Sequence, residues 1–230
     1  MRLCWLNNAL CLALLALLGW AVLELPETPR GLTEPALARL PDSGVSNPVT
    51  AALLNYRAHD TLLEIAVFLV AIVGVWSLRE DRVARVDLRE RPLVLSLLRL
   101  VLPVLVVAGG YLLWIGSFAP GGAFQGGALL GGALVLLLLT GLDGRALKRE
   151  RWLRVGLTLG LVVFVGVGGG VMLLKGRLLE YPRASAGNWI LIIEAAALVS
   201  IGLTLGGLFL GGRPAVEDDA PPTSEKPAHD

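Results

Sequence analysis

Six apolar runs, each about as long as a lipid bilayer is thick, constrain the fold of this chain more than any other feature of its sequence. A helix needs about 20 predominantly apolar residues to cross the hydrocarbon core. Segments of this length cross economically only as helices, because unpaired backbone groups are costly in hydrocarbon. The runs are, approximately, Leu3–Leu23, Thr61–Leu78, Leu93–Ser117, Phe124–Leu142, Val155–Leu174 and Asn188–Leu210. The sequence therefore predicts an all-α integral membrane protein with about six transmembrane helices in the lipid bilayer.

Composition excludes several functional classes. Hydrophobic residues make up 55% of the 230 residues and charged residues only 17%, against about 25% charged in an ordinary soluble domain. The formal net charge of +1 provides no basic field for nucleic acid. The two cysteines and two histidines are scattered and predict neither a four-ligand zinc site nor an iron–sulfur cluster. We therefore expect no cofactor, no metal site and no nucleic-acid partner. We also expect no independent enzyme, because no catalytic set of nucleophile, base and oxyanion donor is evident.

The basic residues between the runs predict the orientation, because lysine and arginine are retained on the cytoplasmic side. They are concentrated after the second and fourth runs, at Arg79, Arg82, Arg85, Arg89 and Arg91 and at Arg145, Lys148, Arg149, Arg151 and Arg154. These connections are expected inside, which with an even number of spans places both termini in the cytoplasm. The first run exceeds the apolar core of a usual signal peptide, so we expect it to be retained as a helix.

The two ends of the chain differ from the apolar runs. Residues 1–46 are predicted to hold the first transmembrane helix and a proline-rich external loop, in which Leu32–Leu40 favours a short surface helix. Residues 213–230 are rich in proline and acidic residues and have few apolar ones, which predicts a disordered acidic C-terminal tail.

Glycine pairs four residues apart mark the faces of several predicted helices. Gly127 and Gly131 form one pair, and Gly202 and Gly206 form another. Glycine at this spacing lets a neighbouring backbone approach closely, which is how membrane helices associate.

A short connection without charge joins the third and fourth runs. It contains Pro120, Gly121, Gly122, Gln125 and Gly126. The proline and the glycines favour a tight turn and close helix packing. Gln125 either has a structural role there, satisfying backbone groups, or orients an ion or a water molecule.

Two ionisable residues lie inside predicted spans, where charge is costly enough to indicate function. Glu194 lies about two turns into the sixth span, where desolvation disfavours a charged carboxylate. It is therefore a candidate proton or cation site, with a structural hydrogen bond to another helix as the alternative. Arg99 lies about two turns into the third span. Its side chain either snorkels to the interface or pairs with a carboxylate of a neighbouring helix or subunit.

Glu64 allows two interpretations. Thr61-x-x-Glu64 has the form of a capping box, in which the hydroxyl and the carboxylate close the start of a helix. Burial against other helices would instead make Glu64 an ion site that exchanges a proton or a cation. Asp60 is a good helix starter and a further ion-path candidate. The adjacent His59 either relays protons or is merely solvated.

Two sequence blocks resemble a known family. Pro120-Gly-Gly-Ala-Phe-Gln-Gly-Gly127, placed between two apolar spans, resembles the signature of the MnhB domain, found in a small subunit of the multisubunit Mrp-type cation/proton antiporters. This resemblance covers residues 91–212, predicted as a four-helix membrane domain. Residues 47–90 contain Asn47-Pro-Val-Thr and Asp60-Thr61-x-x-Glu64. This segment, with one predicted span, resembles the C-terminal region of the large antiporter subunit and the small subunit of membrane-bound hydrogenases.

The resemblance implies a function that the residues alone do not. It implies a subunit that supports the movement of Na⁺ and H⁺ across a bacterial inner membrane, beside larger subunits that resemble the membrane subunits of respiratory complex I. Glu64 would then serve the cation path. The same fold in a membrane-bound hydrogenase or another redox-driven complex remains an alternative, as does a purely structural assembly subunit.

Overall fold

The computed structural model describes residues 2–24, 31, 33–78, 92–139, 150–176 and 178–209. Regular structure in these ranges is helical, with no strand among them. The helices long and apolar enough to cross a bilayer are α4 (Ala58–Ser77), α5 (Pro92–Ile115), α8 (Glu150–Lys175) and α9 (Ala186–Phe209). The prediction of an all-α, multi-pass membrane protein is therefore confirmed.

The first and fourth predicted spans correspond to α1 (Arg2–Leu23) and α6 (Ala123–Leu139). Within the described residues their apolar helical stretches, Asn8–Leu23 and Ala123–Leu139, are shorter than those of the other four. The total of six spans and the cytoplasmic placement of both termini therefore stay predictions. The acidic tail 213–230 and the arginine-rich connection 79–91 lie outside the described residues.

The chain divides into two compact units, residues 1–37 and 38–230. The first unit contains α1 and most of the short helix α2 (Thr33–Ala38), which lies where the sequence favours a surface helix. The second unit contains the other described helices and the hydrophobic core.

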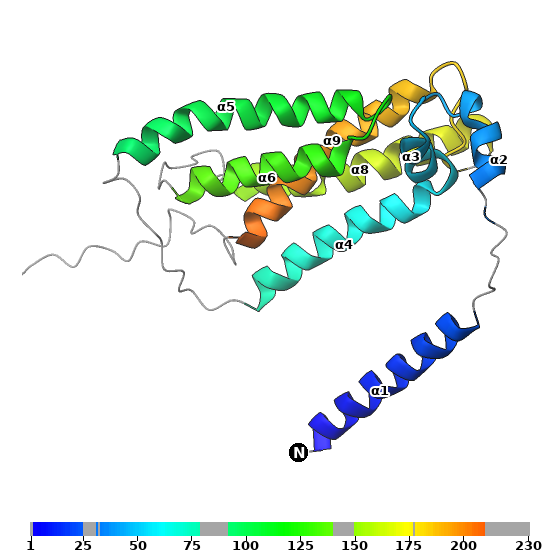
Figure 1. Ribbon diagram of the computed structural model, residues 1–230, viewed down its shortest axis with the longest axis horizontal. Coiled ribbons are helices and arrows are strands. Elements are labelled where there is room, and N and C mark those ends of the chain that lie inside the picture. Colours follow the sequence, from blue (N-terminus) through cyan, green and yellow to red (C-terminus); the bar gives the residue numbers. More distant parts are fainter. Residues whose placement is uncertain are drawn as a thin grey trace, which may run out of the picture. The chain divides into compact units, whose positions relative to one another are not determined.

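Helix α9 is the central element of the second unit. It packs chiefly against α6 and α8 and also contacts α4 and α5 (Figure 1). Buried residues make up 67% of its apolar stretch, against 28% or less in α4, α5 and α8. Ile190, Ile193 and Ile201 of α9 join Phe164 of α8 in the core. The other long helices expose large apolar side chains, as expected of helices that face lipid or other subunits.

The close contact between α6 and α9 depends on glycine. A Cβ atom added at Gly127 would lie 2.8 Å from Cγ2 of Ile201, and one added at Gly131 would lie 2.8 Å from Cβ of Leu205. On the facing helix, a Cβ at Gly202 would lie 3.0 Å from Cβ of Leu130. Side chains at these positions would force the two helices apart.

The connections that precede α4, α6 and α9 gather at one end of the second unit (Figure 1). They include the short helices η1 (Leu40–Asp42), α3 (Pro48–Ala51) and η2 (Ala52–Tyr56), of which η2 is a π-helical segment. Ser46 N–H donates to Ser117 O at 3.0 Å, so this segment contacts the turn between α5 and α6. The turn itself folds back on α5, because Gly122 N–H donates to Leu112 O at 2.8 Å.

Candidate functional site

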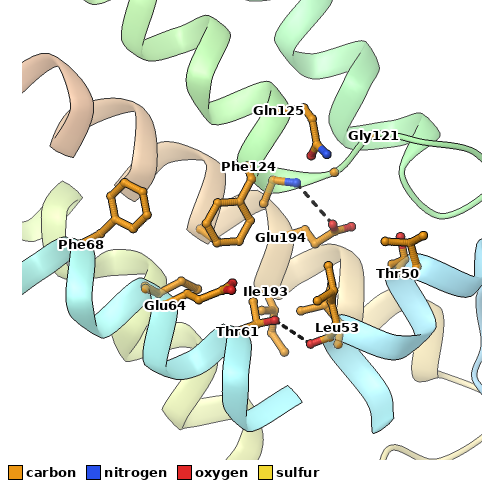
Figure 2. Close-up of a pocket in the computed structure, with 16 residues that line it drawn as sticks. Thr50, Leu53, Thr61, Glu64, Phe68, Gly121, Phe124, Gln125, Ile193 and Glu194 are labelled. Atoms are coloured by element: carbon orange, nitrogen blue, oxygen red, sulfur yellow. Dashed lines mark hydrogen bonds between the residues drawn. The ribbon is translucent and has the colours of Figure 1, made fainter. Parts of the chain in front are cut away.

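A cleft of about 390 Å³ lies where the beginnings of α4, α6 and α9 meet. Its polar side chains are Thr50, Thr61, Glu64, Gln125 and Glu194, and most of the remaining lining is apolar (Figure 2). No lysine, arginine or histidine of the described residues lines it. Two carboxyl groups therefore face one cleft with no basic side chain in its lining, which makes the cleft attractive to cations and protons.

Glu194 forms the inner wall of this cleft. It lies in the third turn of α9, and only 4% of its surface is exposed. Its Oε1 accepts a hydrogen bond from the Ala123 N–H at 3.3 Å, so the predicted structural bond to another helix is present (Figure 2). Its Oε2 is buried and has no hydrogen-bond partner among the described residues. A buried polar atom without a partner is costly, so this oxygen is suited to hold a proton or a bound cation.

Gly122 makes the room that this carboxyl group occupies. Its φ of +111° lies in a region that side chains rarely adopt. A Cβ atom added there would lie 2.6 Å from Oε1 of Glu194 and 3.8 Å from Oε1 of Gln125. The glycine of the predicted turn thus serves two purposes, since it permits the backbone conformation and leaves space for Glu194.

Glu64 lies across the cleft from α9, on α4. Its side chain is exposed and has no hydrogen bond or ion pair among the described residues. Figure 2 shows it extending from α4 on the same side as Thr61. The two glutamates singled out in the sequence, Glu64 and Glu194, therefore line one cavity but in different surroundings, one exposed and one buried.

The capping-box interpretation of Thr61 and Glu64 is wrong. Helix α4 begins at Ala58, and its N-cap residue is Arg57, without a side-chain cap. Thr61 is already inside the helix, and its hydroxyl donates to Leu53 O at 2.7 Å, across the break between η2 and α4. The helical path already starts at Pro48 and is interrupted only at Arg57, whose φ is −124°. Glu64 therefore has no capping role in this part of the chain.

The other predicted ion-path and supporting residues are divided. Gln125 and Thr61 line the cleft, whereas Asp60, His59 and Arg99 do not. Asp60 forms a surface ion pair with Arg57, with Oδ2 and Nη2 2.5 Å apart, and such exposed pairs contribute little. His59 is exposed in the first turn of α4.

Arg99 is exposed on α5 and has no ionic partner among the described residues. Its side chain is therefore available to the interface or to a neighbouring subunit, as both sequence interpretations require.

The predicted packing residues surround the turn before α6. Pro120 is exposed and Gly121 is half-buried, whereas Gly126 is buried. A Cβ atom at Gly126 would lie 2.7 Å from Gly109 O of α5, which explains the need for glycine at this crossing. Together with Gly127 and Gly131, these residues bring α6 close to both α5 and α9.

Sequence reasoning missed Asn47 and Thr50. Asn47 caps α3, and its Oδ1 accepts the Val49 N–H at 3.1 Å. Asn47-Pro48 is a recognisable helix start, so this local role was visible in the sequence. The bonds of Asn47 and Thr50 to the turn before α6 had no such signal, because their partners are 66 to 72 residues away.

The described residues contain no group of three or more histidine, cysteine, aspartate or glutamate side chains that could hold a metal ion. The cleft is thus built from two carboxyl groups, hydroxyl and amide groups, and apolar side chains. It is suited to the reversible binding of a proton or of a hydrated monovalent cation. Its volume admits several water molecules beside an ion.

Comparison with known families places this cleft in context. A family model described as "Domain related to MnhB subunit of Na+/H+ antiporter" matches residues 93–211, just over half of the chain. The chain belongs to the MnhB family. The resemblance carried by Pro120–Gly127 is therefore confirmed, and those residues lie within the matched range. In sequence, no curated protein matches this MnhB-family chain.

Two solved structures match the fold of this MnhB-family chain. A chain of the membrane-bound sulfane sulfur reductase, an archaeal respiratory membrane complex, is 24% identical with a TM-score of 0.68, and the match covers 92% of this chain and 98% of that chain. A chain of the Mrp complex from Dietzia sp. DQ12-45-1b is 22% identical with a TM-score of 0.64, over 94% of this chain and 26% of that chain. This chain thus spans about a quarter of the Mrp chain. Both matches extend beyond the MnhB region, so the similarity of fold includes most of the residues before Leu93.

Proposed function

We propose that this chain is a membrane subunit of a multisubunit monovalent cation/proton antiporter, most simply for sodium, and that Glu64 and Glu194 line part of its ion path. Membership of the MnhB family supports the antiporter, and the fold similarity to chains of multisubunit membrane complexes supports action within an assembly. The chain is a transport subunit that works with other antiporter subunits resembling those of respiratory complex I, in the inner membrane of a bacterium.

The observation that carries the ion-path proposal is the arrangement of the two glutamates. They line one cleft whose walls contain no basic side chain among the described residues, and Oε2 of the buried Glu194 has no partner there. A purely structural glutamate would be expected to have both carboxyl oxygens satisfied. The hydrogen bond from Ala123 accounts for one oxygen only.

The geometry suggests how exchange would proceed. The Ala123 N–H holds Oε1 of Glu194 in a fixed place, while Oε2 takes either a proton or a cation. The two ligands exclude each other, because a protonated carboxyl group has lost the charge that attracts the cation. Glu64, exposed at the cleft, provides a second carboxylate at which ions are collected before they reach Glu194.

A redox-driven complex is the second candidate function. The similarity of fold to a chain of an archaeal respiratory membrane complex favours it. In such an assembly the same cleft would move ions with energy from electron transfer elsewhere. We favour the antiporter because the family model that matches most of the second unit describes an antiporter subunit.

The proposal is tested by sodium-dependent proton exchange in everted membrane vesicles that contain the whole complex. Glu194→Gln and Glu64→Gln remove a charge while keeping the size and polarity of each side chain. We expect exchange to fall to background in Glu194→Gln and to fall strongly in Glu64→Gln, with the complex still assembled. The matched control is Asp42→Asn, which breaks only an exposed ion pair with Arg183.

Normal exchange by both glutamine variants would contradict the ion-path role. Exchange by Glu64→Gln alone would restrict the path to Glu194. Loss of exchange in Asp42→Asn as well would show that the assay responds to any change at this end of the chain.

A further inference from the structure

The side chain of Asn47 is buried beneath the turn between α5 and α6, with 4% of its surface exposed. Its Nδ2 donates to Gly116 O at 2.9 Å and to Ala119 O at 2.8 Å, both in that turn. The same atom lies 3.0 Å from Oγ1 of Thr50. These contacts exceed what a helix cap needs, since the cap itself uses only Oδ1.

Thr50 supports the same contact from the next turn of helix. Its hydroxyl donates to Gly116 O at 2.6 Å, and the side chain is 4% exposed. The backbone contributes as well, because the Asn47 N–H donates to Ser117 O at 3.1 Å. Carbonyl groups of Gly116, Ser117 and Ala119 are thus all held by one short segment, residues 46–50, which we call the clip.

The turn transmits this constraint to the ion site. A Cβ atom added at Gly116 would lie 2.7 Å from both N and Cα of Gly122, so the two ends of the turn are in direct contact. The residue after Gly122 is Ala123, whose N–H donates to Oε1 of Glu194. A continuous path of contacts therefore runs from Asn47 and Thr50 through Gly116 and Gly122 to the Glu194 carboxyl group.

We propose that Asn47 and Thr50 are positioning residues of the ion site, which hold the turn so that the Ala123 N–H faces the Glu194 carboxyl group. This inference rests on the proposed function of Glu194. A hydrogen bond donated to a carboxylate stabilises its charged form, which is the form that binds a cation. If the clip is released, the donor is no longer fixed, and the site binds sodium more weakly although Glu194 itself is unchanged.

Two substitutions separate the clip from the helix cap. Asn47→Asp keeps an oxygen that accepts the Val49 N–H but replaces the donor to Gly116 and Ala119 by a second acceptor. Thr50→Val keeps the shape of the side chain and removes the hydroxyl that donates to Gly116. Thr50→Ser restores that hydroxyl. Thr158→Val is the matched control, because the Thr158 hydroxyl bonds only to carbonyls of its own helix, α8.

The measurement is the sodium dependence of proton exchange in vesicles with the whole complex, with the amount of assembled complex determined in parallel. We expect Thr50→Val and Asn47→Asp to raise the half-saturating sodium concentration by about tenfold, the effect of weakening one charge-assisted hydrogen bond. The maximal rate per assembled complex changes little. Thr50→Ser and Thr158→Val should keep the original half-saturating concentration.

An unchanged half-saturating sodium concentration in Thr50→Val would overturn the inference, as would a loss of maximal rate alone. If Asn47→Asp fails to assemble, Thr50→Val decides. Glu194→Gln is measured beside them. Normal exchange in Glu194→Gln would overturn the proposed ion path and with it the positioning role. Loss of exchange in Glu194→Gln with unaltered clip variants would overturn the positioning role alone.

Discussion

At the scale of single residues, the geometry around Glu194 depends on one glycine. Gly122 has a φ of +111°, and a Cβ atom at this position would lie 2.6 Å from the Glu194 carboxyl group. Gly176 has a φ of +77° but open space around it. The two glycines share a backbone requirement and differ in their surroundings, so they separate backbone strain from the displacement of Glu194.

We predict that Gly122→Ala abolishes exchange, whereas Gly176→Ala does not. Both substitutions carry a backbone strain of about 1–3 kcal/mol, but only the first pushes a methyl group against the carboxyl group. Exchange per assembled complex in everted vesicles checks this prediction. Equal losses in the two variants would mean that strain, and not the space around Glu194, controls activity.

Tyr181, in the connection between α8 and α9, has a buried hydroxyl without a partner among the described residues. Burial raises the pKa of its phenol above the ordinary value of 10.0, because the charged form is disfavoured. The phenol contributes stability below pH 10, and this contribution is lost as the pH rises above that value and the unfolded chain loses its proton first.

We predict that Tyr181→Phe raises stability at neutral pH by about 1 kcal/mol, because an unpaired hydroxyl leaves the interior. The variant should also lose less stability above pH 10. Thermal denaturation of the purified complex at both pH values measures the effect. A lower midpoint at neutral pH would mean that another subunit provides a partner for the hydroxyl.

At the scale of helices, the contact between α6 and α9 is set by which glycines face inward. Gly131 faces Leu205, whereas the adjacent Gly132 has open space around it. We therefore predict that Gly131→Leu strongly reduces the amount of folded protein in the membrane, and that Gly132→Leu leaves it near the original level. Quantitative detection of the assembled chain after mild solubilisation tests this pair. Equal amounts of both variants would contradict the packing of α6 on α9.

The positions of the helices were predictable because a membrane span leaves a long apolar run in the sequence. The beginning of α4 was not. The Thr61-x-x-Glu64 pattern is locally correct for a cap, but the helical path already starts at Pro48 and passes through η2. Thr61 therefore finds Leu53 O as a partner, and a local pattern was overruled by the preceding segment.

At the scale of the whole molecule, the site was only partly predictable. Glu64 and Glu194 stand out in the sequence because a charge within an apolar run is conspicuous. The cleft that they share was not visible, because residues 71 positions apart, such as Ala123 and Glu194, meet only in the folded chain. The same holds for Asn47, which contacts Gly116 from 69 positions away. Sequence periodicity reports the local face of a helix and not which helices meet.

The orientation of the cleft follows from the same reasoning. The beginnings of α4, α6 and α9 lie at one end of the second unit, where the cleft is formed. The distribution of arginine and lysine predicts that this end faces outward. On that prediction Glu64 and Glu194 line an outer half of the ion path, and other subunits complete the inner half.

The most direct test of the account is to identify what the chain assembles with. The tagged chain is purified from its native membrane in a gentle detergent, and the bound proteins are identified by mass spectrometry. We predict antiporter subunits that resemble the membrane subunits of respiratory complex I, without metal-cluster proteins. Bound hydrogenase or other redox subunits, or a chain that purifies alone, would contradict the assignment to a cation/proton antiporter.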